Sequence, residues 1–391
     1  MSLSRRAFVR VLGLGGAGTL AGSVGSGYES RAGVAWALNS MQPMNRRYDA
    51  GFINLSSNSN PRGPGKAVLE ALRGRISHRV GRYPDNVGDL SAAIAALIGA
   101  KPENILLSTG SGEELVGAAR AFVTAARPLV TGAPSYEDPE RTSKTLGLPV
   151  KPVPVDSSLR LDLDAMATAA KAAGLVYVCN PNNPTAMAHS ASAIAEFVKR
   201  VKSASPDTAI LIDEAYIDYA KDPSVATAVP LALEYPGVFM TRTFSKAYGL
   251  AGLRLGYAAA QPGTIKRLSE AWGFGSVNVL TAAAALAGLD DTEHLRAEIA
   301  ENARVRQFTL SALKEMGYSA TDSETNFVWV NVRRPSKEFR DLCFKLGVLV
   351  GRDFPTMPTY SRISLGTMEE MRQAVEIFRK VPVPLASAAG G

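Results

Sequence analysis

The residue with the clearest chemical potential in this sequence is a lysine in an apolar stretch. Lys246 stands in the run 243–257, which reads TFSKAYGLAGLRLGY and follows an expected strand. Apolar surroundings remove water from an amine and lower its pKa, and only the neutral amine attacks an aldehyde to form a Schiff base. A single lysine is more often a solvated surface charge. The residues around Lys246 therefore determine whether a Schiff-base lysine or a surface lysine is the better interpretation.

Three more stretches combine strand ends with polar or glycine-rich turns. The run 109–114 (TGSGEE) ends a strand and opens a helix, which presents free backbone N–H groups and the positive end of the helix dipole to an anion. The run 180–185 (NPNNPT) follows the strand 175–179, and 213–216 (DEAY) follows the strand 209–212. Taken singly, each has an ordinary structural explanation: a turn into a helix, a proline-rich turn, or an aspartate that caps a helix.

Taken together, in this order and spacing, the four stretches resemble the signature of class I/II aminotransferases. These are pyridoxal-phosphate (PLP) enzymes of fold type I, the aspartate-aminotransferase type. The residues of these stretches are most similar to those of the histidinol-phosphate aminotransferase subgroup. The resemblance covers residues 54–381. It implies that Lys246 holds pyridoxal 5'-phosphate as a Schiff base and moves the substrate's α-proton, so that an amino group passes from an amino donor to a 2-oxo acid.

The same resemblance implies which residues hold the cofactor. Asp213 pairs with the pyridine nitrogen and keeps it protonated, which makes the ring an electron sink. Asn183 and Tyr216 bond the phenolic oxygen. The other cofactor contacts expected from the motifs are the phosphate ligands Ser111, Gly112, Thr243, Ser245 and Arg254, the stacking ring Tyr136, and Tyr83 from a neighbouring subunit. If Tyr83 crosses in this way, the active unit is a homodimer.

Substrate binding is expected from two arginines and from the run 58–64 (NSNPRGP). Arg362 matches the family's anion-binding arginine, Arg352 is a second candidate, and either can hold a carboxylate or phosphate with its planar fork. Asn60 and Arg62 are expected beside the substrate side chain. The histidinol-phosphate subgroup commonly has Glu and Tyr at positions 59 and 62. A guanidinium at position 62 would favour an acidic donor, and the alternative is that Arg62 points to solvent from a Pro-Gly turn.

The elements that position these residues alternate between strand and helix patterns. Apolar runs separated by helical stretches over residues 77–288 predict an α/β large domain with a mostly parallel sheet, and the resemblance makes it seven-stranded. In such sheets ligands bind at the carboxyl ends of the strands. Residues 289–381 predict a smaller α+β domain, which 38–76 joins, and 382–391 predict a disordered tail. The expected strands are 104–108, 129–131, 175–179, 209–212, 238–241, 255–259, 326–332 and 362–365.

The first 37 residues resemble a twin-arginine signal peptide. Arg5 and Arg6 precede a mildly apolar stretch, and Ala35-Trp36-Ala37 offers a small-x-small cleavage site. The prediction is export by the twin-arginine translocation machinery to the periplasm or outside. A start at position 41 or 44, both methionines, would leave the protein cytoplasmic.

Composition excludes several other classes. Hydrophobic residues make up 46% and charged residues 20% of the chain, as in an ordinary globular protein, and the formal charge of +7 needs no nucleic-acid partner. Two distant cysteines, Cys179 and Cys343, predict neither a disulfide framework nor a metal site. Two alternatives stay open: a PLP-dependent decarboxylase or lyase on the same scaffold, and a PLP-binding regulator.

Overall fold

The computed structural model describes residues 51–76, 78–84 and 87–381 of the 391-residue chain. The expected signal peptide and the expected C-terminal tail lie outside the described residues. Among the described helices, none is both long and apolar enough to cross a membrane.

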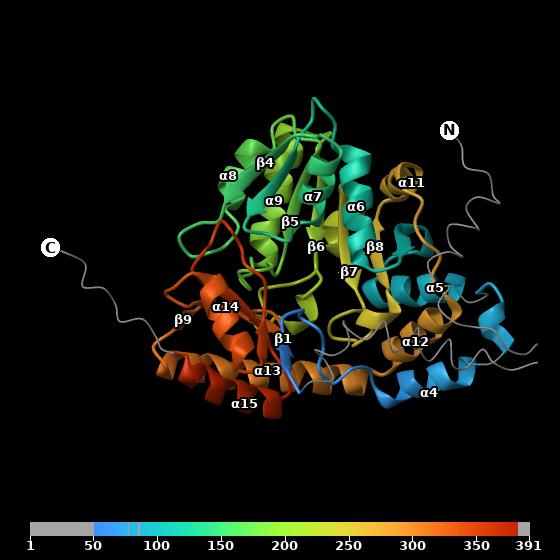
Figure 1. Ribbon diagram of the computed structural model, residues 1–391. Coiled ribbons are helices and arrows are strands. Elements are labelled where there is room, and N and C mark those ends of the chain that lie inside the picture. The colour runs from blue at the N-terminus through green and yellow to red at the C-terminus, as the bar shows by residue number, and fades with distance from the viewer. Residues whose placement is uncertain (1–50, 77, 85–86, 382–391) are drawn as a thin grey trace, which may run out of the picture. The chain divides into compact units, whose positions relative to one another are not determined.

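A seven-stranded sheet forms the centre of the larger lobe (Figure 1). Its order is β2-β8-β7-β6-β5-β3-β4, and every neighbouring pair is parallel except those that involve β8, which is antiparallel to β7 and β2. This confirms the expected α/β fold class. The strands are β2 (Ile105–Ser108), β3 (Leu129–Ala133), β4 (Val150–Pro154), β5 (Leu175–Cys179), β6 (Ala209–Asp213), β7 (Val238–Thr243) and β8 (Gly256–Ala260).

The central strands β5 and β6 form because they are apolar along their length, except for Asp213 at the end of β6. Every residue of β5 (LVYVC) and of β6 (AILID) is buried, as expected for parallel strands covered on both faces. β4 (VKPVP) was not predicted, because two prolines and a lysine interrupt its apolar pattern. It lies at the edge of the sheet, where a missing N–H donor is tolerated.

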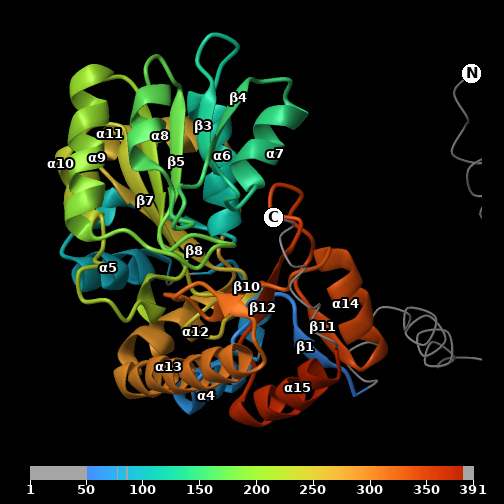
Figure 2. The same cartoon turned by 90° about the vertical axis from the view of Figure 1, so that its left-hand side faces the viewer.

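Helices cover both faces of this sheet (Figure 2). One apolar cluster joins the sheet to α6 and α11, and a second cluster joins its other face to α5, α8, α9, α10 and α12. The bounds are α5 (Val87–Ile98), α6 (Ser111–Phe122), α7 (Asp138–Thr145), α8 (Leu163–Ala169), α9 (Ala191–Ala204), α10 (Val229–Glu234), α11 (Pro262–Ala271) and α12 (Val279–Asp290), with short 3-10 turns at His78–Gly81, Pro102–Asn104, Ile217–Tyr219 and Ala251–Leu253.

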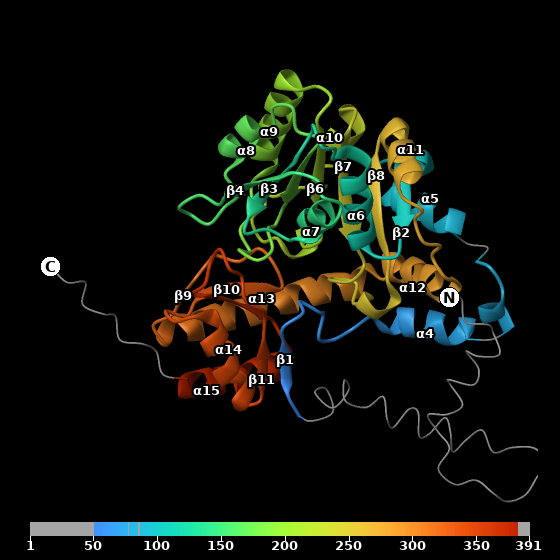
Figure 3. The same cartoon turned by 45° about the horizontal axis from the view of Figure 1, so that its top comes forward.

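The smaller lobe is built from both ends of the described chain. β1 (Ile53–Leu55) pairs in parallel with β11 (Val348–Val350), and β10 (Phe327–Asn331) pairs antiparallel with β12 (Tyr360–Ser364) and β9 (Ser319–Ala320). Three helices complete its separate core: α13 (Thr292–Glu315), α14 (Ser336–Lys345) and α15 (Met368–Lys380). α4 (Lys66–Arg75) instead packs along α12, as Figure 3 shows. The chain between β1 and α4 therefore runs from one lobe to the other.

Candidate active site

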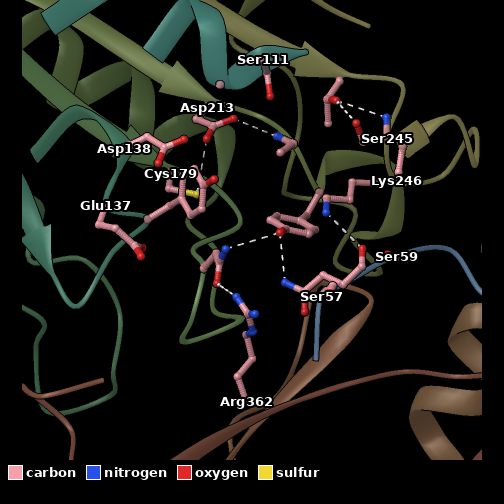
Figure 4. Close-up of a pocket in the computed structure, with 18 of the residues that line it drawn as sticks. Ser57, Ser59, Ser111, Glu137, Asp138, Cys179, Asp213, Ser245, Lys246 and Arg362 are labelled. Atoms are coloured by element: carbon pink, nitrogen blue, oxygen red, sulfur yellow. Dashed lines mark hydrogen bonds between the residues drawn. The ribbon is translucent and has the colours of Figure 1, made fainter. Parts of the chain in front are cut away.

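A cavity of about 460 Å³ opens where β5, β6 and β7 end (Figure 4). Its wall combines residues of the larger lobe with Arg352 and Arg362 of the smaller lobe and with the segment that follows β1. The predicted site residues that line it are Ser111, Gly112, Tyr136, Asn183, Asp213, Tyr216, Thr243, Ser245, Lys246, Arg254, Arg352 and Arg362. The structure thus brings most of the expected site into one place.

Lys246 projects into this cavity from the loop after β7. Its Nζ donates a hydrogen bond to the backbone oxygen of Asn58 across 3.1 Å and lies 5.4 Å from the ring centre of Tyr216. Desolvation by burial, followed by the positive charges of Arg362 and Arg254, lowers the pKa of Lys246 to about 8. A far larger fraction of this amine is therefore neutral near pH 7 than for a solvated lysine.

The loop around Lys246 has a fixed path. The backbone N–H of Leu250 donates to the oxygen of Phe244, and both side chains are buried. Gly249 closes a turn onto Lys246 with a φ of +70°, and a Cβ there would lie 2.4 Å from the backbone carbon of Gly63. Glycine is required at this position because the run 58–64 packs directly against the lysine loop.

Asp213 is the last residue of β6 and is almost fully buried. Its Oδ2 accepts a hydrogen bond from the hydroxyl of Tyr177 at 2.9 Å, and its Oδ1 accepts from the N–H of Ala215 at 3.2 Å and the hydroxyl of Thr241 at 3.3 Å. Burial raises the pKa of Asp213 to about 6, although these hydrogen bonds oppose the shift. A cationic group beside this carboxylate would relieve the cost of its buried charge.

A chain of hydrogen bonds joins Tyr216 to the smaller lobe. The oxygen of Tyr216 accepts from the side-chain amides of Asn58 at 3.1 Å and Asn183 at 3.4 Å. The amide oxygen of Asn183 in turn accepts from Nη1 of Arg362 at 2.8 Å. Nη2 of Arg362 donates to the backbone oxygen of Ser56, while its Nε is buried without a hydrogen-bond partner among the described residues.

Asn58 is a site residue to which sequence reasoning assigned no role. It is fully buried with a φ of +54°, its backbone N–H donates to the hydroxyl of Ser364 at 2.8 Å, and its oxygen accepts from Asn326 as well as from Lys246. The sequence indication for this conformation is local, because asparagine tolerates the left-handed region of backbone conformation better than most residues. Its partners, however, lie far away in the chain.

Two glycines shape an anion cradle at the start of α6. Gly110 has a φ of +98°, and a Cβ there would lie 2.3 Å from Nη2 of Arg254. A Cβ on Gly256 would lie 2.2 Å from the backbone nitrogen of Ser111. Because neither glycine carries a side chain, an arginine and the positive end of a helix converge beside the hydroxyls of Thr243 and Ser245. This donor set fits a phosphate group.

Three predicted site residues lie elsewhere in the described structure. Tyr83 is 97% exposed. Asn60 donates from its side-chain amide to the backbone oxygen of Ala247 at 3.2 Å, and Arg62 donates from Nε to Oε2 of Glu298 at 2.8 Å. Asn60 and Arg62, which were expected beside the substrate side chain, are not among the residues that line this cavity. Their polar groups bind the protein instead, and Arg62 does not point to solvent either.

The cavity offers no alternative metal centre. Within the described ranges, no group of three or more histidine, cysteine, aspartate and glutamate side chains could hold a metal ion, and both cysteines are free and buried. A desolvated lysine amine, a buried carboxylate at the end of the neighbouring strand and a phosphate cradle define an α/β enzyme of fold type I that holds pyridoxal phosphate. Residues 50–378 match the family "Aminotransferase class I and II", and the chain belongs to that family.

Known relatives support this assignment. The chain is 34% identical to the histidinol-phosphate aminotransferase of Moorella thermoacetica, over 84% of this chain and 85% of that protein. It is 35% identical to histidinol-phosphate aminotransferase 2 of Methylococcus capsulatus, over 85% of this chain and 91% of that protein. The expected activity is confirmed at the level of the reaction: the protein is an aminotransferase.

Solved structures agree with the fold and the cofactor. The histidinol-phosphate aminotransferase of Sinorhizobium meliloti in complex with pyridoxal-5'-phosphate has a TM-score of 0.79 at 27% identity, covering 91% of this chain and 100% of that chain. Aspartate aminotransferase from Thermus thermophilus with maleate shares the fold, with a TM-score of 0.75 at 19% identity over 92% of this chain and 100% of that chain. Pyridoxal 5'-phosphate is therefore the cofactor of this enzyme, as the sequence predicted.

Proposed function

We propose that the enzyme transfers an amino group between an amino donor and a 2-oxo acid through a Schiff base on Lys246. The observation that carries this proposal is the state of the Lys246 amine. It is half-buried beneath Tyr216, in the cavity that Asp213 also lines, and its pKa is lowered to about 8. Such an amine both attacks a carbonyl carbon and accepts a proton near neutral pH.

The other residues orient the cofactor and hold its charges. Bound pyridoxal phosphate supplies a ring that withdraws electrons from the substrate's α-carbon. Asp213 would keep the ring nitrogen protonated, and Asn183 and Tyr216 would bond the phenolic oxygen. The start of α6 and Arg254 would hold the phosphate. Lys246 would accept the donor's α-proton at Nζ and donate it again to complete the transfer.

Arg362 is proposed to bind the anionic end of the donor, either an α-carboxylate or a phosphate. Its guanidinium is almost fully buried in the cavity wall, and Nε has no hydrogen-bond partner within the described part of the chain. A buried donor of this kind is costly until an acceptor reaches it. Histidinol phosphate, the substrate in the relatives' names, carries such an anionic end and is the first donor to test.

Borohydride reduction of the PLP-loaded protein, followed by peptide mapping, tests the central proposal. We expect the reduced cofactor on Lys246 and on no other lysine. A donor and a 2-oxo acid should then yield the matching new amino acid. Label on another lysine, or release of CO₂ or an elimination product without a new amino acid, would contradict the proposal.

We also propose a homodimer in which Tyr83 reaches the phosphate of the neighbouring subunit. Tyr83 is exposed, and so are the apolar side chains of Ile76 and Val80, which are close to it in the sequence and which a second copy could cover. Mixing inactive Lys246→Ala with Tyr83→Ala chains tests this arrangement. A mixed dimer has one site with both residues intact, so activity should reappear. If the mixture stays no more active than its components, Tyr83 does not cross a subunit boundary.

Export by the twin-arginine route is a further proposal, supported by Arg5, Arg6 and the apolar stretch that follows them. Replacing both arginines by lysine keeps the charge, so a loss of export would show that a receptor recognises the pair. Fractionation of cells that express either version measures this. The proposal fails if the double-lysine protein leaves the cytoplasm as readily as the wild type.

A further inference from the structure

Two ion pairs border the outer part of the cavity. Glu137, the residue before α7, pairs with Arg352 from the loop after β11, and Asp138 pairs with Arg141 one turn along α7. All four side chains line the cavity, and Glu137 and Asp138 lie on the same side of it in Figure 4. The local charges cancel, so the remaining unbonded atoms decide what this wall can bind.

Arg352 has little capacity left for a substrate anion. Its Nη2 is taken by Glu137, its Nη1 donates to the backbone oxygen of Asp353 at 3.1 Å, and its guanidinium carbon lies 4.1 Å from the ring centre of Phe354. An anion that approached this guanidinium would have to displace a carboxylate that is already part of the protein. Arg352 is therefore neutralised in place.

Glu137, by contrast, keeps an unused acceptor. Only one of its carboxylate oxygens pairs with Arg352, and the other, Oε2, is buried without a hydrogen-bond partner among the residues described. A buried carboxylate oxygen without a donor is unfavourable, so a rotation of the Glu137 side chain that brings this oxygen to a ligand's N–H group would be favoured. Glu137 and Arg362 both line this cavity, so one bound donor can contact both side chains.

We propose that Glu137 determines side-chain specificity. With Arg362 at the anionic end of the donor, Glu137 accepts a hydrogen bond from a nitrogen at the far end of the donor's side chain. Favoured donors carry an imidazole, ammonium or guanidinium group there. Donors that end in a second carboxylate are disfavoured, because they bring no N–H group to Oε2 of Glu137 and because Glu137 already occupies Arg352. This inference rests on the proposed function, and it makes Glu137 the residue that selects the donor's side chain, with a preference opposite to the acidic one that the sequence suggested for Arg62.

Three donors of similar length and shape test the proposal: lysine, norleucine and 2-aminoadipate. Each is mixed with the PLP-loaded enzyme without a 2-oxo acid, and the change in cofactor absorbance gives kcat/KM for the first half-reaction. We expect the wild type to prefer lysine over norleucine and norleucine over 2-aminoadipate. Glu137→Gln should lower the value for lysine by about tenfold or more, leave norleucine unchanged and raise 2-aminoadipate.

Glu140→Gln is the matched control, because Glu140 lies in the first turn of α7, which begins directly after Glu137, pairs with Lys144 and is not among the residues that line this cavity. It should change none of the three values. Equal changes for all three donors in Glu137→Gln, or a wild type that prefers 2-aminoadipate, would overturn the proposal. If no donor changes the absorbance, the proposed function itself fails, and calorimetric binding of the same three amino acids to both variants still decides the role of Glu137.

Discussion

The backbone oxygen of Asn58 accepts a hydrogen bond from Nζ of Lys246 at 3.1 Å, although 188 positions of sequence separate the two residues. Asn58 is itself bonded to Ser364 and Asn326 of the smaller lobe. The lysine amine is thus held by a segment that links the two lobes, and its environment depends on how they pack together. Its lowered pKa is a property of that packing.

The pKa of Lys246 predicts how cofactor loading depends on pH. Because the neutral amine is the reactive form and the pKa is about 8, the rate at which PLP attaches should rise about tenfold per pH unit below 8 and level off above it. Arg362→Gln removes a like charge and should move this plateau to higher pH. Stopped-flow absorbance measures both rates, and a wild-type rate that still climbs steeply at pH 10 would contradict the lowered pKa.

Asp213→Asn tests the role of the carboxylate in turnover. The variant keeps the phosphate cradle, so PLP should still bind, but a ring nitrogen without an anionic partner is a poorer electron sink. We expect kcat to fall by at least about two orders of magnitude with the cofactor absorbance retained. Near-normal kcat in the loaded variant would remove Asp213 from the chemistry.

The raised pKa of Asp213 also predicts how the cofactor-free protein responds to pH. The side chain titrates near 3.8 when unfolded and at about 6 when folded, so its contribution to stability is complete below 3.8 and disappears as the pH rises through 6. As the pH rises over this interval, the free energy of unfolding of the wild type should fall by about 3 kcal/mol relative to that of Asp213→Asn. Urea unfolding of both cofactor-free proteins at pH 4 and pH 7 measures the difference. Parallel changes in the two proteins would show that Asp213 is not responsible.

Gly110→Ala tests the anion cradle. The new Cβ would lie 2.3 Å from Nη2 of Arg254, so the arginine has to move and the dissociation constant for PLP should rise by at least tenfold. Gly99→Ala is the control, since Gly99 also has a positive φ, of +69°, but no atom within 4 Å of an added Cβ. Both variants place alanine at a positive φ and so carry backbone strain, but only Gly110→Ala should also weaken the binding of PLP. Equal PLP affinities would argue against the cradle.

Arg62→Met tests the ion pair with Glu298. The side chain of Glu298 is 2% exposed, so losing its partner leaves a buried charge and should lower the free energy of unfolding by about 3 kcal/mol. The double variant Arg62→Met, Glu298→Gln should recover part of this loss. Because Arg62 lies outside the cavity, KM should change equally for acidic and neutral donors. A larger rise for acidic donors would restore Arg62 as a specificity residue.

Much of the fold could be predicted from sequence because its signals are local. The runs that form β5 and β6 are continuously apolar, and such runs are buried wherever they lie in a parallel sheet. The stretches around Ser111, Asp213 and Lys246 each place a strand end beside a turn within a few residues. Since strand ends meet at one edge of such a sheet, local order was enough to bring these residues into one cavity.

What only the tertiary structure decided is which polar groups meet across long separations. The sequence indicated a guanidinium at position 62 near the substrate, but α13 brings Glu298 to it. The sequence predicted that the guanidinium of Arg352 binds a substrate anion, but the packing of the two lobes places Glu137 against it. A short-range pattern specifies where a side chain begins, whereas its partner depends on the relative positions of elements that fold separately. For that reason the sequence by itself determined the chemistry of this protein, and the packing of its lobes decided the charges that the substrate meets.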